Sequence, residues 1–488
     1  MAKNAPNPNA YRESRLTSQA SQARGWLIAL ATGAFLWLSL ASGAWAEPNK
    51  APSGTPAQIA PTETADSQPT NETAKSPAEN SQAAPDPASR GGTNLLEWQK
   101  TCQTATPTEI SQRLKAGAPA EARDPVGMTP LMMAAMANPN PLSIKVLLDA
   151  GAKPETMEKR FGYNALRLAA VFNPVPAVAQ ALIFSPESVN EKDFSGNTAL
   201  TLAVARNPNP QVVELMVKAG GDLRAQDDLG QGVVALAALQ NSNPAILTTL
   251  IKLRAQIDQV DRLGESALLK VARAGSNPEI LEILSRAGAK IDLRSKSGET
   301  PLMAAAQNPN ESMLKTLLRA GADPKALDSS GSGLLFAAAL GNSNPEVLKS
   351  LLRLGLDVNQ QNKMGLTPLM VATANPNPQM TRLLLVQGAK VNLTDHEGRT
   401  ALMLAARMSA EPLVLKTLLA AGARLDLKDK KGQSALDLAE QNPAREMVAA
   451  LKAWQEANPQ RAADASGSPT PQGTEPASQA ASPPAGRE

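Results

Sequence analysis

Very few side chains of this sequence have the chemistry needed for catalysis or metal binding. Its 488 residues include one Cys and one His, whereas zinc sites and nucleophilic centres bring several such groups together. Cys102 has no His near it in the sequence, so we expect a small buried residue rather than a nucleophile. His396 lies between Asp395 and Glu397 in a segment rich in turn residues, where we expect a solvent-facing loop side chain. The sequence therefore predicts no catalytic, cofactor-binding or metal-binding residue, and a protein that is not an enzyme.

Charge and aromatic content argue against a nucleic-acid-binding protein. The chain has 48 Lys and Arg against 45 Asp and Glu, for a formal net charge of +3, whereas DNA-binding proteins usually carry a basic stripe. Aromatic residues make up 3% of the chain, too few for a platform on which bases stack. One short basic run, at Lys428, Lys430 and Lys431, is interpreted as a solvated face; the alternative is that it attracts an anionic partner.

The N-terminal residues have the pattern of an export signal. Residues 1–24 are polar and basic, residues 26–46 are uncharged and largely apolar, and the run closes with Ala44-Trp45-Ala46. This pattern predicts a signal peptide at residues 1–46, cleaved between Ala46 and Glu47. The alternative is a retained membrane anchor, because 21 residues are enough to span a bilayer. Both interpretations predict an exported chain, either periplasmic or secreted after cleavage, or held at the inner membrane outside the cytoplasm.

Two further segments lack the apolar residues that a folded core needs. Residues 47–92 contain eight prolines and no aromatic residue, and residues 457–488 have a similar composition. Such segments bury too little apolar surface to offset the entropy lost on ordering. We expect a disordered Pro/Ala-rich linker at 47–92 and a disordered tail at 457–488.

The segment between them is periodic. A pattern of Gly, any residue, Thr, Ser or Asn, then Pro or Ala and finally Leu recurs every 33–35 residues. Such a fixed period indicates a repeat architecture. The pattern starts at Gly127, Gly162, Gly196, Gly264, Gly298, Gly365, Gly398 and Gly432, with degenerate copies at Gly230 and Gly331.

Each period predicts two helices joined by a proline turn. In the first copy, residues 131–136 form an Ala- and Met-rich segment that we interpret as a first helix, and the Asn-Pro-Asn-Pro sequence at 138–141 ends it. The second Asn is expected to cap a second helix whose first residue is Pro. That helix should end at Gly151, in the left-handed conformation. An Asp three residues before most pattern glycines, such as Asp395, predicts a loop held by its side chain.

Units of this length, with Thr-Pro-Leu at the first helix and Gly-Ala after the second, resemble ankyrin repeats. The resemblance implies an all-α helix–turn–helix–loop solenoid of about 10–11 repeats over residues 93–456. Trp98 and Trp454 are expected to cover its two ends. The sequence departs from the family in carrying one extra residue in most proline turns. It also replaces the usual His after Thr-Pro-Leu, most often by Met, which fills the space by packing; these residues are Met132, Met303, Met370 and Met403.

The resemblance also implies a function, because ankyrin arrays bind other proteins through the loop tips and first helices that line a concave face. Two adjacent tips of this sequence carry Arg160, Phe161, Tyr163 and Phe194, residue types that dominate binding hot spots. We expect these residues to anchor a protein partner; alternatively, the rings pack between neighbouring loops. The sequence thus predicts a non-catalytic protein–protein interaction scaffold of the bacterial envelope. The alternative is a membrane-anchored structural scaffold retained by segment 26–46, which alone would give the protein contact with a membrane.

Overall fold

The computed structural model describes residues 95–409, 411–442 and 445–458. The expected signal peptide with its cleavage site at Ala46 and Glu47, the linker 47–92 and nearly all of the tail 457–488 lie outside these residues.

The chain divides into two compact units, and unit 1 ends at Arg262. Its described part contains five helix pairs. The first helices are α2 (Leu95–Cys102), α4 (Pro130–Ala137), α6 (Ala165–Phe172), α9 (Ala199–Arg206) and α11 (Val233–Gln240). The second helices are α3 (Pro107–Lys115), α5 (Pro141–Asp149), α7 (Pro176–Gln180) continued by α8 (Pro186–Asn190), α10 (Pro210–Lys218) and α12 (Pro244–Lys252).

Unit 2 begins at Leu263, and its described part contains six helix pairs. The first helices are α13 (Ala267–Ala274), α15 (Pro301–Gln307), α17 (Leu334–Gly341), α19 (Pro368–Ala372), α21 (Ala401–Met408) and α23 (Ala435–Glu440). The second helices are α14 (Pro278–Arg286), α16 (Glu311–Arg319), α18 (Pro345–Leu352), α20 (Pro378–Val386), α22 (Pro412–Ala420) and α24 (Glu446–Ala457).

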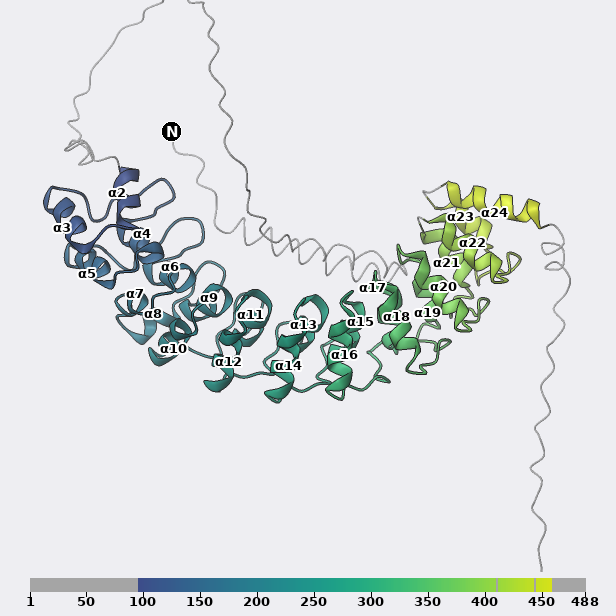
Figure 1. The fold of residues 1–488 in the computed structure, drawn as a ribbon. Coiled ribbons are helices and arrows are strands. Elements are labelled where there is room, and N and C mark those ends of the chain that lie inside the picture. Colours follow the sequence, from purple (N-terminus) through teal and green to yellow (C-terminus); the bar gives the residue numbers. More distant parts are fainter. Residues whose placement is uncertain (1–94, 410, 443–444, 459–488) are drawn as a thin grey trace, which may run out of the picture. The chain divides into compact units, whose positions relative to one another are not determined.

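Within each unit the helices stack in chain order. First helices pack on first helices, as α4 does on α6 and α13 on α15, and second helices form a neighbouring layer, as α10 and α12 do (Figure 1). The predicted all-α array of helix–turn–helix–loop units is therefore confirmed. In the described residues, extended pairing is limited to two isolated bridges, and none of the helices there combines the length and apolar character needed to cross a membrane.

The core lies between the two layers of helices. The small Ala side chains of the first helices allow neighbouring helices to pack closely around it. In α9, Leu200, Ala203 and Val204 are fully buried, because a helix with neighbours on both sides exposes little of its surface. The second helix α10 buries one face instead, with Val212, Val213 and Met216 fully buried. Methionine fills the position of the family's usual His: the Met370 sulfur accepts a weak bond from the Thr367 N–H at 3.4 Å and is buried. Packing therefore replaces the missing imidazole there, as predicted.

The proline turns follow the sequence prediction. Asn138 ends α4 in an extended conformation, and Asn140 caps α5 by accepting the Leu142 N–H at 3.0 Å. Pro141 then occupies the first helical position, where the missing N–H leaves no bond unmade. After α5, Gly151 has φ +88°, which is the left-handed cap that the Gly-Ala motif predicts.

The first Asn of most turns has a second role that the sequence analysis missed; the turns after α13 and α21 have Gly275 and Ser409 at this position. The Asn207 side-chain amide is fully buried and donates to the backbone carbonyls of Ala170 and Asn173 in the preceding repeat, at 2.9 and 3.0 Å. Its Oδ1 accepts the Asn209 N–H at 2.9 Å. The resulting asparagine ladder satisfies carbonyls that the ends of the first helices would otherwise leave buried and unpaired. Its members are Asn138, Asn173, Asn207 and Asn241 in unit 1, and Asn308, Asn342, Asn375 and Asn442 in unit 2.

The two end repeats differ in how completely they are closed. Trp98 in α2 is fully buried and its Nε1–H donates to the Pro119 carbonyl at 3.1 Å, so it covers the core as predicted. Trp454 in α24 is half-exposed and lines a shallow cavity of about 520 Å³ together with Pro412 of α22. Cys102 is buried as expected, and burial raises the pKa of its thiol to about 12.

Candidate interaction surface

Most loop tips are built around one acidic side chain, whereas Asn362 takes this place before Gly365 and Ser295 before Gly298. Asp193 Oδ1 accepts the backbone N–H groups of Ser195 and Asn197, both at 2.8 Å, and so holds the loop in a tight turn. The same pair of bonds forms around Asp124, Asp227, Asp328, Asp395 and Asp429, which confirms the predicted structural role of this Asp. In the loop before Gly162 the longer Glu158 accepts three N–H groups.

Main-chain bonds connect most tips to the next. The Phe194 N–H donates to the Phe161 carbonyl at 3.3 Å, and the Asp228 N–H donates to the Ser195 carbonyl at 3.1 Å. Loops that are 33–35 residues apart in sequence therefore lie side by side. Side chains at matching positions of successive loops form a row along the edge of the unit.

The four predicted anchor residues come together on two of these adjacent tips. The Arg160 guanidinium carbon lies 4.8 Å from the centre of the Phe161 ring, a cation–π arrangement. The Phe161 and Tyr163 ring centres are 5.5 Å apart at an interplanar angle of 33°. Phe194 lies over Gly162: a Cβ added to that glycine would be 2.8 Å from the Phe194 ring, and the φ of Gly162 is +75°. Only glycine permits this close contact between ring and backbone.

The aromatic cluster formed by Arg160, Phe161, Tyr163 and Phe194 packs together and is still open to solvent. Phe161 is 47% exposed and Phe194 63% exposed, whereas Tyr163 is half-buried. Burial, reinforced by the Asp193 carboxylate, raises the pKa of the Tyr163 hydroxyl. The rings thus pack between neighbouring loops, as the alternative interpretation expects, and Phe161 and Phe194 also expose apolar surface to solvent. That these residues anchor a partner stays a prediction.

A buried arginine lies beneath this cluster. Arg167 is 1% exposed, and its Nη2 lies 3.3 Å from Oε2 of the half-exposed Glu191. Its Nη1 donates to the Gly162 carbonyl at 3.5 Å, while its buried Nε has no hydrogen-bond partner. Arg167 follows Leu166 in the repeat pattern, where four other repeats place a methionine. Among the described residues, the repeat that carries the cluster therefore has a buried polar atom without a hydrogen-bond partner, whereas the repeats on either side of it have none.

The same repeat exposes two further aromatic rings that the sequence analysis did not single out. Its second helix is interrupted between α7 and α8, and Phe184 in this interruption is 60% exposed. Phe172, at the end of α6, is 54% exposed. Two signals in the sequence indicate the interrupted second helix. The Gly-Ala motif is missing from this repeat, and Pro186 lies inside the expected helix, where a proline ends or kinks it.

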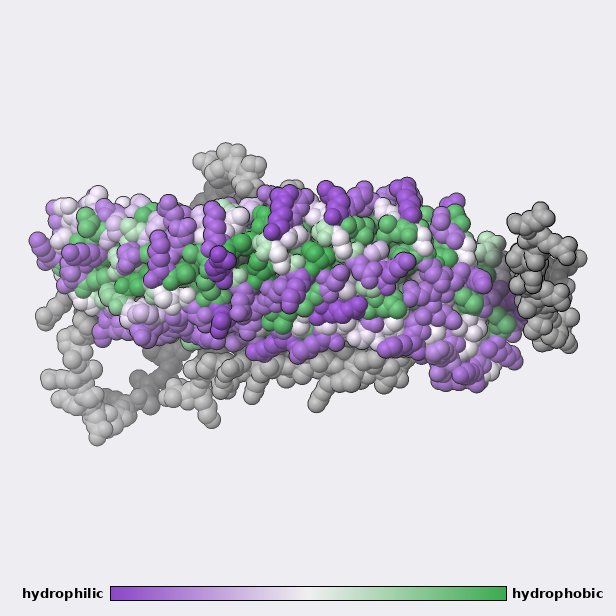
Figure 2. Space-filling model, turned by 90° about the horizontal axis from the view of Figure 1, so that it is seen from below, coloured by the Kyte–Doolittle hydropathy of each residue, from purple (hydrophilic) through white to green (hydrophobic). Residues whose placement is uncertain are grey.

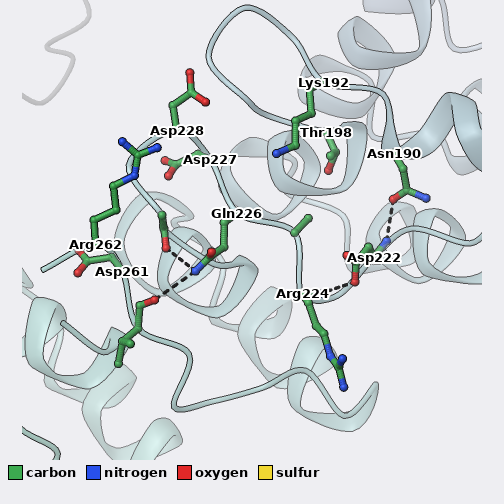
Figure 3. Close-up of a pocket in the computed structure, with 13 residues that line it drawn as sticks. Asn190, Lys192, Thr198, Asp222, Arg224, Gln226, Asp227, Asp228, Asp261 and Arg262 are labelled. Atoms are coloured by element: carbon green, nitrogen blue, oxygen red, sulfur yellow. Dashed lines mark hydrogen bonds between the residues drawn. The ribbon is translucent and has the colours of Figure 1, made fainter. Parts of the chain in front are cut away.

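A polar pocket of about 790 Å³ lies beside the next loops of unit 1 (Figure 3). Lys192, Arg224 and Arg262 line it together with four aspartates, and the Gln226 amide donates to the Gly230 and Val260 carbonyls in its floor. Its aspartates hold loops, since Asp227 Oδ1 accepts the Leu229 and Gln231 N–H groups and Asp222 Oδ1 accepts the Arg224 N–H. We interpret the pocket as a by-product of loop packing.

The other candidates for chemistry are surface or core residues. His396 is exposed at a tip, as expected, and its N–H donates to the Met364 carbonyl at 3.0 Å. Lys428, Lys430 and Lys431 are exposed on the loop after α22. Within the described ranges, no group of three or more His, Cys, Asp or Glu residues is arranged to hold a metal ion.

The face seen in Figure 2 is mixed in character. Hydrophilic residues lie in bands over it, with smaller hydrophobic areas between them. Exposed apolar residues of the second helices, such as Leu142, Val386 and Leu413, are spread over α5, α20 and α22. These exposed apolar residues therefore do not gather in one patch, in contrast to the aromatic cluster at the tips.

Comparison with known proteins agrees with the repeat geometry. A family model described as ankyrin repeats (3 copies) matches residues 131–227, 234–328, 334–429 and 377–463, which together make up more than half of the chain. No curated protein sequence matches the chain.

Proposed function

The chain belongs to the ankyrin-repeat family, and from this premise we propose that it is a non-catalytic scaffold of the bacterial envelope whose loop tips and first helices bind a partner protein. Ankyrin repeats are in general protein–protein interaction modules, so a protein partner is the expected ligand class. The aromatic cluster is the observation that carries the proposal.

The cluster has the properties of an interface anchor. Phe161 and Phe194 are exposed, yet they are held in place by Arg160 stacking, by Tyr163 and by the contact with Gly162. Rigid aromatic side chains lose little conformational entropy on binding, and their burial supplies much of the binding energy at hot spots. The Arg160 guanidinium adds a polar group at the edge of the apolar surface, which favours orientation of the partner.

Binding rather than catalysis is supported by the engagement of the titratable loop side chains. Asp193, Asp227 and Asp395 direct their carboxylates to backbone N–H groups, so they stabilise loops. Cys102 is buried with a raised pKa, which disfavours the thiolate that a nucleophile requires. These observations support a surface that recognises another protein by shape and apolar contact.

The test is quantitative affinity capture from the envelope of the native host. The double variant Phe161→Ala/Phe194→Ala should lose at least 90% of the principal captured protein, a loss of roughly 1.4 kcal/mol or more in binding free energy. The matched control is Phe172→Ala/Phe184→Ala, which removes two equally exposed rings outside the cluster. Circular dichroism should report unchanged helix content for both variants. Equal capture by the wild type and the cluster variant would refute the anchor.

We further propose that the array acts outside the cytoplasm, on the basis of the sequence of residues 1–46. N-terminal sequencing of the mature protein should begin at Glu47. A retained Met1 together with recovery in the membrane fraction would instead support the alternative, a structural scaffold anchored by segment 26–46.

A further inference from the structure

The loops of the two units differ in charge. In unit 1 they contain eleven basic and thirteen acidic residues, counted over 115–128, 149–163, 184–197, 218–231 and 252–262. In unit 2 the corresponding loops contain fourteen basic and nine acidic residues, counted over 286–299, 319–332, 353–366, 386–399 and 420–433. The excess of positive charge is therefore confined to the loops of unit 2.

The acidic residues of the unit 2 loops are largely engaged within the loops. Asp328, Asp395 and Asp429 each accept two backbone N–H groups through Oδ1. Asp395 also pairs with Arg399 at 2.8 Å, and Asp426 pairs with Arg424. These carboxylates stabilise turns, whereas the lysines of the tips extend into solvent.

Three of those lysines occupy the same position in alternate repeats. Lys296, Lys363 and Lys430 stand two residues before Gly298, Gly365 and Gly432, and they are exposed. Their own N–H groups form the main-chain bonds to the preceding tips, at 2.9, 2.8 and 2.9 Å. Lys431 follows at the last tip, and Lys363 Nζ contacts only a carbonyl oxygen, of Ser329, which leaves its charge uncompensated. We call Lys296, Lys363, Lys430 and Lys431 the basic rim.

The spacing of the basic rim follows from helix packing. Neighbouring packed helices lie about 8–10 Å apart, so equivalent lysines two repeats apart are separated by roughly 16–20 Å. An extended peptide advances about 3.3 Å per residue, so this distance corresponds to about five or six residues. The rim thus matches an extended chain whose negative charges recur at that interval.

We propose that the basic rim binds an extended acidic segment of a partner protein, with carboxylates about six residues apart. A protein segment fits better than a nucleic acid, because the aromatic residues described in unit 2 are the buried Phe336 and Trp454 of α24, and neither is available at the tips for base stacking. The exposed Glu397, between the Lys363 and Lys430 tips, opposes a continuous polyanion but tolerates widely spaced charges. Met364, exposed beside Lys363, adds an apolar contact suited to a peptide.

The proposal is tested by fluorescence anisotropy with the full-length protein and three labelled 16-residue Gly/Ser peptides at low salt. The first carries Glu at positions 2, 8 and 14, the second carries three Glu at positions 7–9, and the third carries Gln at positions 2, 8 and 14. With each exposed ion pair weak, we expect the first peptide to bind roughly tenfold tighter than the Gln peptide and about fivefold tighter than the clustered one. Equal affinities for the spaced and clustered peptides would overturn the proposal.

Two variants locate the binding. The variant Lys296→Gln/Lys363→Gln/Lys430→Gln/Lys431→Gln should abolish the preference for the spaced Glu peptide. The matched control, Lys115→Gln/Lys153→Gln/Lys192→Gln/Lys218→Gln, removes four exposed lysines of unit 1 and should retain it. Equal loss in the control, or tighter binding of a 16-nucleotide oligo-dT than of the peptide, would also overturn the proposal. The Phe161→Ala/Phe194→Ala variant should bind the peptide normally, so this result is independent of the aromatic cluster.

Discussion

The two ends of each repeat use their polar side chains in different ways. At the proline turn, the ladder asparagine is buried. Its side-chain NH₂ group donates to backbone carbonyls and its side-chain oxygen accepts a backbone N–H, as in Asn207. At the loop tip, the Asp and Gly that shape the turn recur, while the residues around the Gly range from Phe161 and Tyr163 to Lys431 and Gln433. The uniform end therefore stabilises the array, and the variable end is where we propose that a partner is recognised.

Within the variable end, unit 1 and unit 2 differ again. The tips of unit 1 carry the aromatic cluster, and those of unit 2 carry the basic rim. The same loop geometry, with a carboxylate bound to two N–H groups, occurs at both surfaces, at Asp193 beside the aromatic cluster and at Asp429 beside the basic rim. A repeat array can thus change its ligand chemistry without changing its fold.

The largest predicted difference between the proline-turn end and the loop-tip end of a repeat is in the reactivity of a cysteine thiol. Cys102 lies at the turn end of α2, where its carbonyl accepts the Asn138 amide at 2.9 Å, and its pKa is raised to about 12. At pH 8 about one molecule in ten thousand would carry the thiolate, so reaction with a disulfide reagent should be at least ~1,000-fold slower than for an exposed thiol. Absorbance of the released thiol measures the rate.

The control places a thiol at the variable end. Ser329→Cys introduces an exposed tip cysteine that should react within minutes, one equivalent per chain, while Cys102 stays unreacted until denaturant is added. Rapid reaction of Cys102 in the folded wild-type protein would show that the turn end opens readily, and the comparison would fail.

The next effect is on stability at the turn end. Asn207→Ala removes two bonds donated to buried carbonyls and one accepted bond, so we expect the free energy of unfolding to fall by about 3 kcal/mol. Urea titration followed by circular dichroism measures it. Asn209→Ala removes the helix cap in the same turn and one solvent-exposed bond to the Pro174 carbonyl, so it should cost only about 1 kcal/mol. Equal losses would mean that burial of the ladder contributes nothing.

The asparagine ladder also marks the limit of what the sequence predicts. Helices, caps and turns follow from local signals, such as the Asn140-Pro141 start of α5 and the left-handed Gly151, and these were predicted. The role of Asn207 depends on carbonyls 34 and 37 residues away, which no local signal identifies. The four residues of the aromatic cluster were predicted from composition and register. The contact of Phe194 with Gly162 and the buried Arg167 beneath the cluster depend on how neighbouring loops pack, and became evident only in the structure.

A smaller effect is expected at the tip glycine under Phe194. Gly162→Ala combines a positive φ with a Cβ 2.8 Å from the Phe194 ring, so we expect a loss of about 2 kcal/mol and displacement of the ring. Gly151→Ala has a similar φ of +88° and open space around the added carbon, so it should lose only about 1 kcal/mol. The difference between the two variants in urea titration isolates the ring contact. Identical losses would show that Phe194 moves away without cost, and that the cluster is not held rigid.

The smallest effect is expected at Met370, where the side chain acts mainly by filling space in the core. Met370 is buried under its tip loop, and its sulfur makes one weak bond to the Thr367 N–H at 3.4 Å. Met370→His restores the residue usual in the family, exchanging apolar packing for a hydrogen bond, so the two changes should largely cancel, with a net change below about 1 kcal/mol in urea titration. Asn375→His, in the same repeat, breaks the ladder bonds to Ala339 and Asn342 and should cost about 3 kcal/mol. A large loss of unfolding free energy for Met370→His would show that this position is as constrained as the asparagine ladder at the proline turn, and is not tolerant like the loop above it.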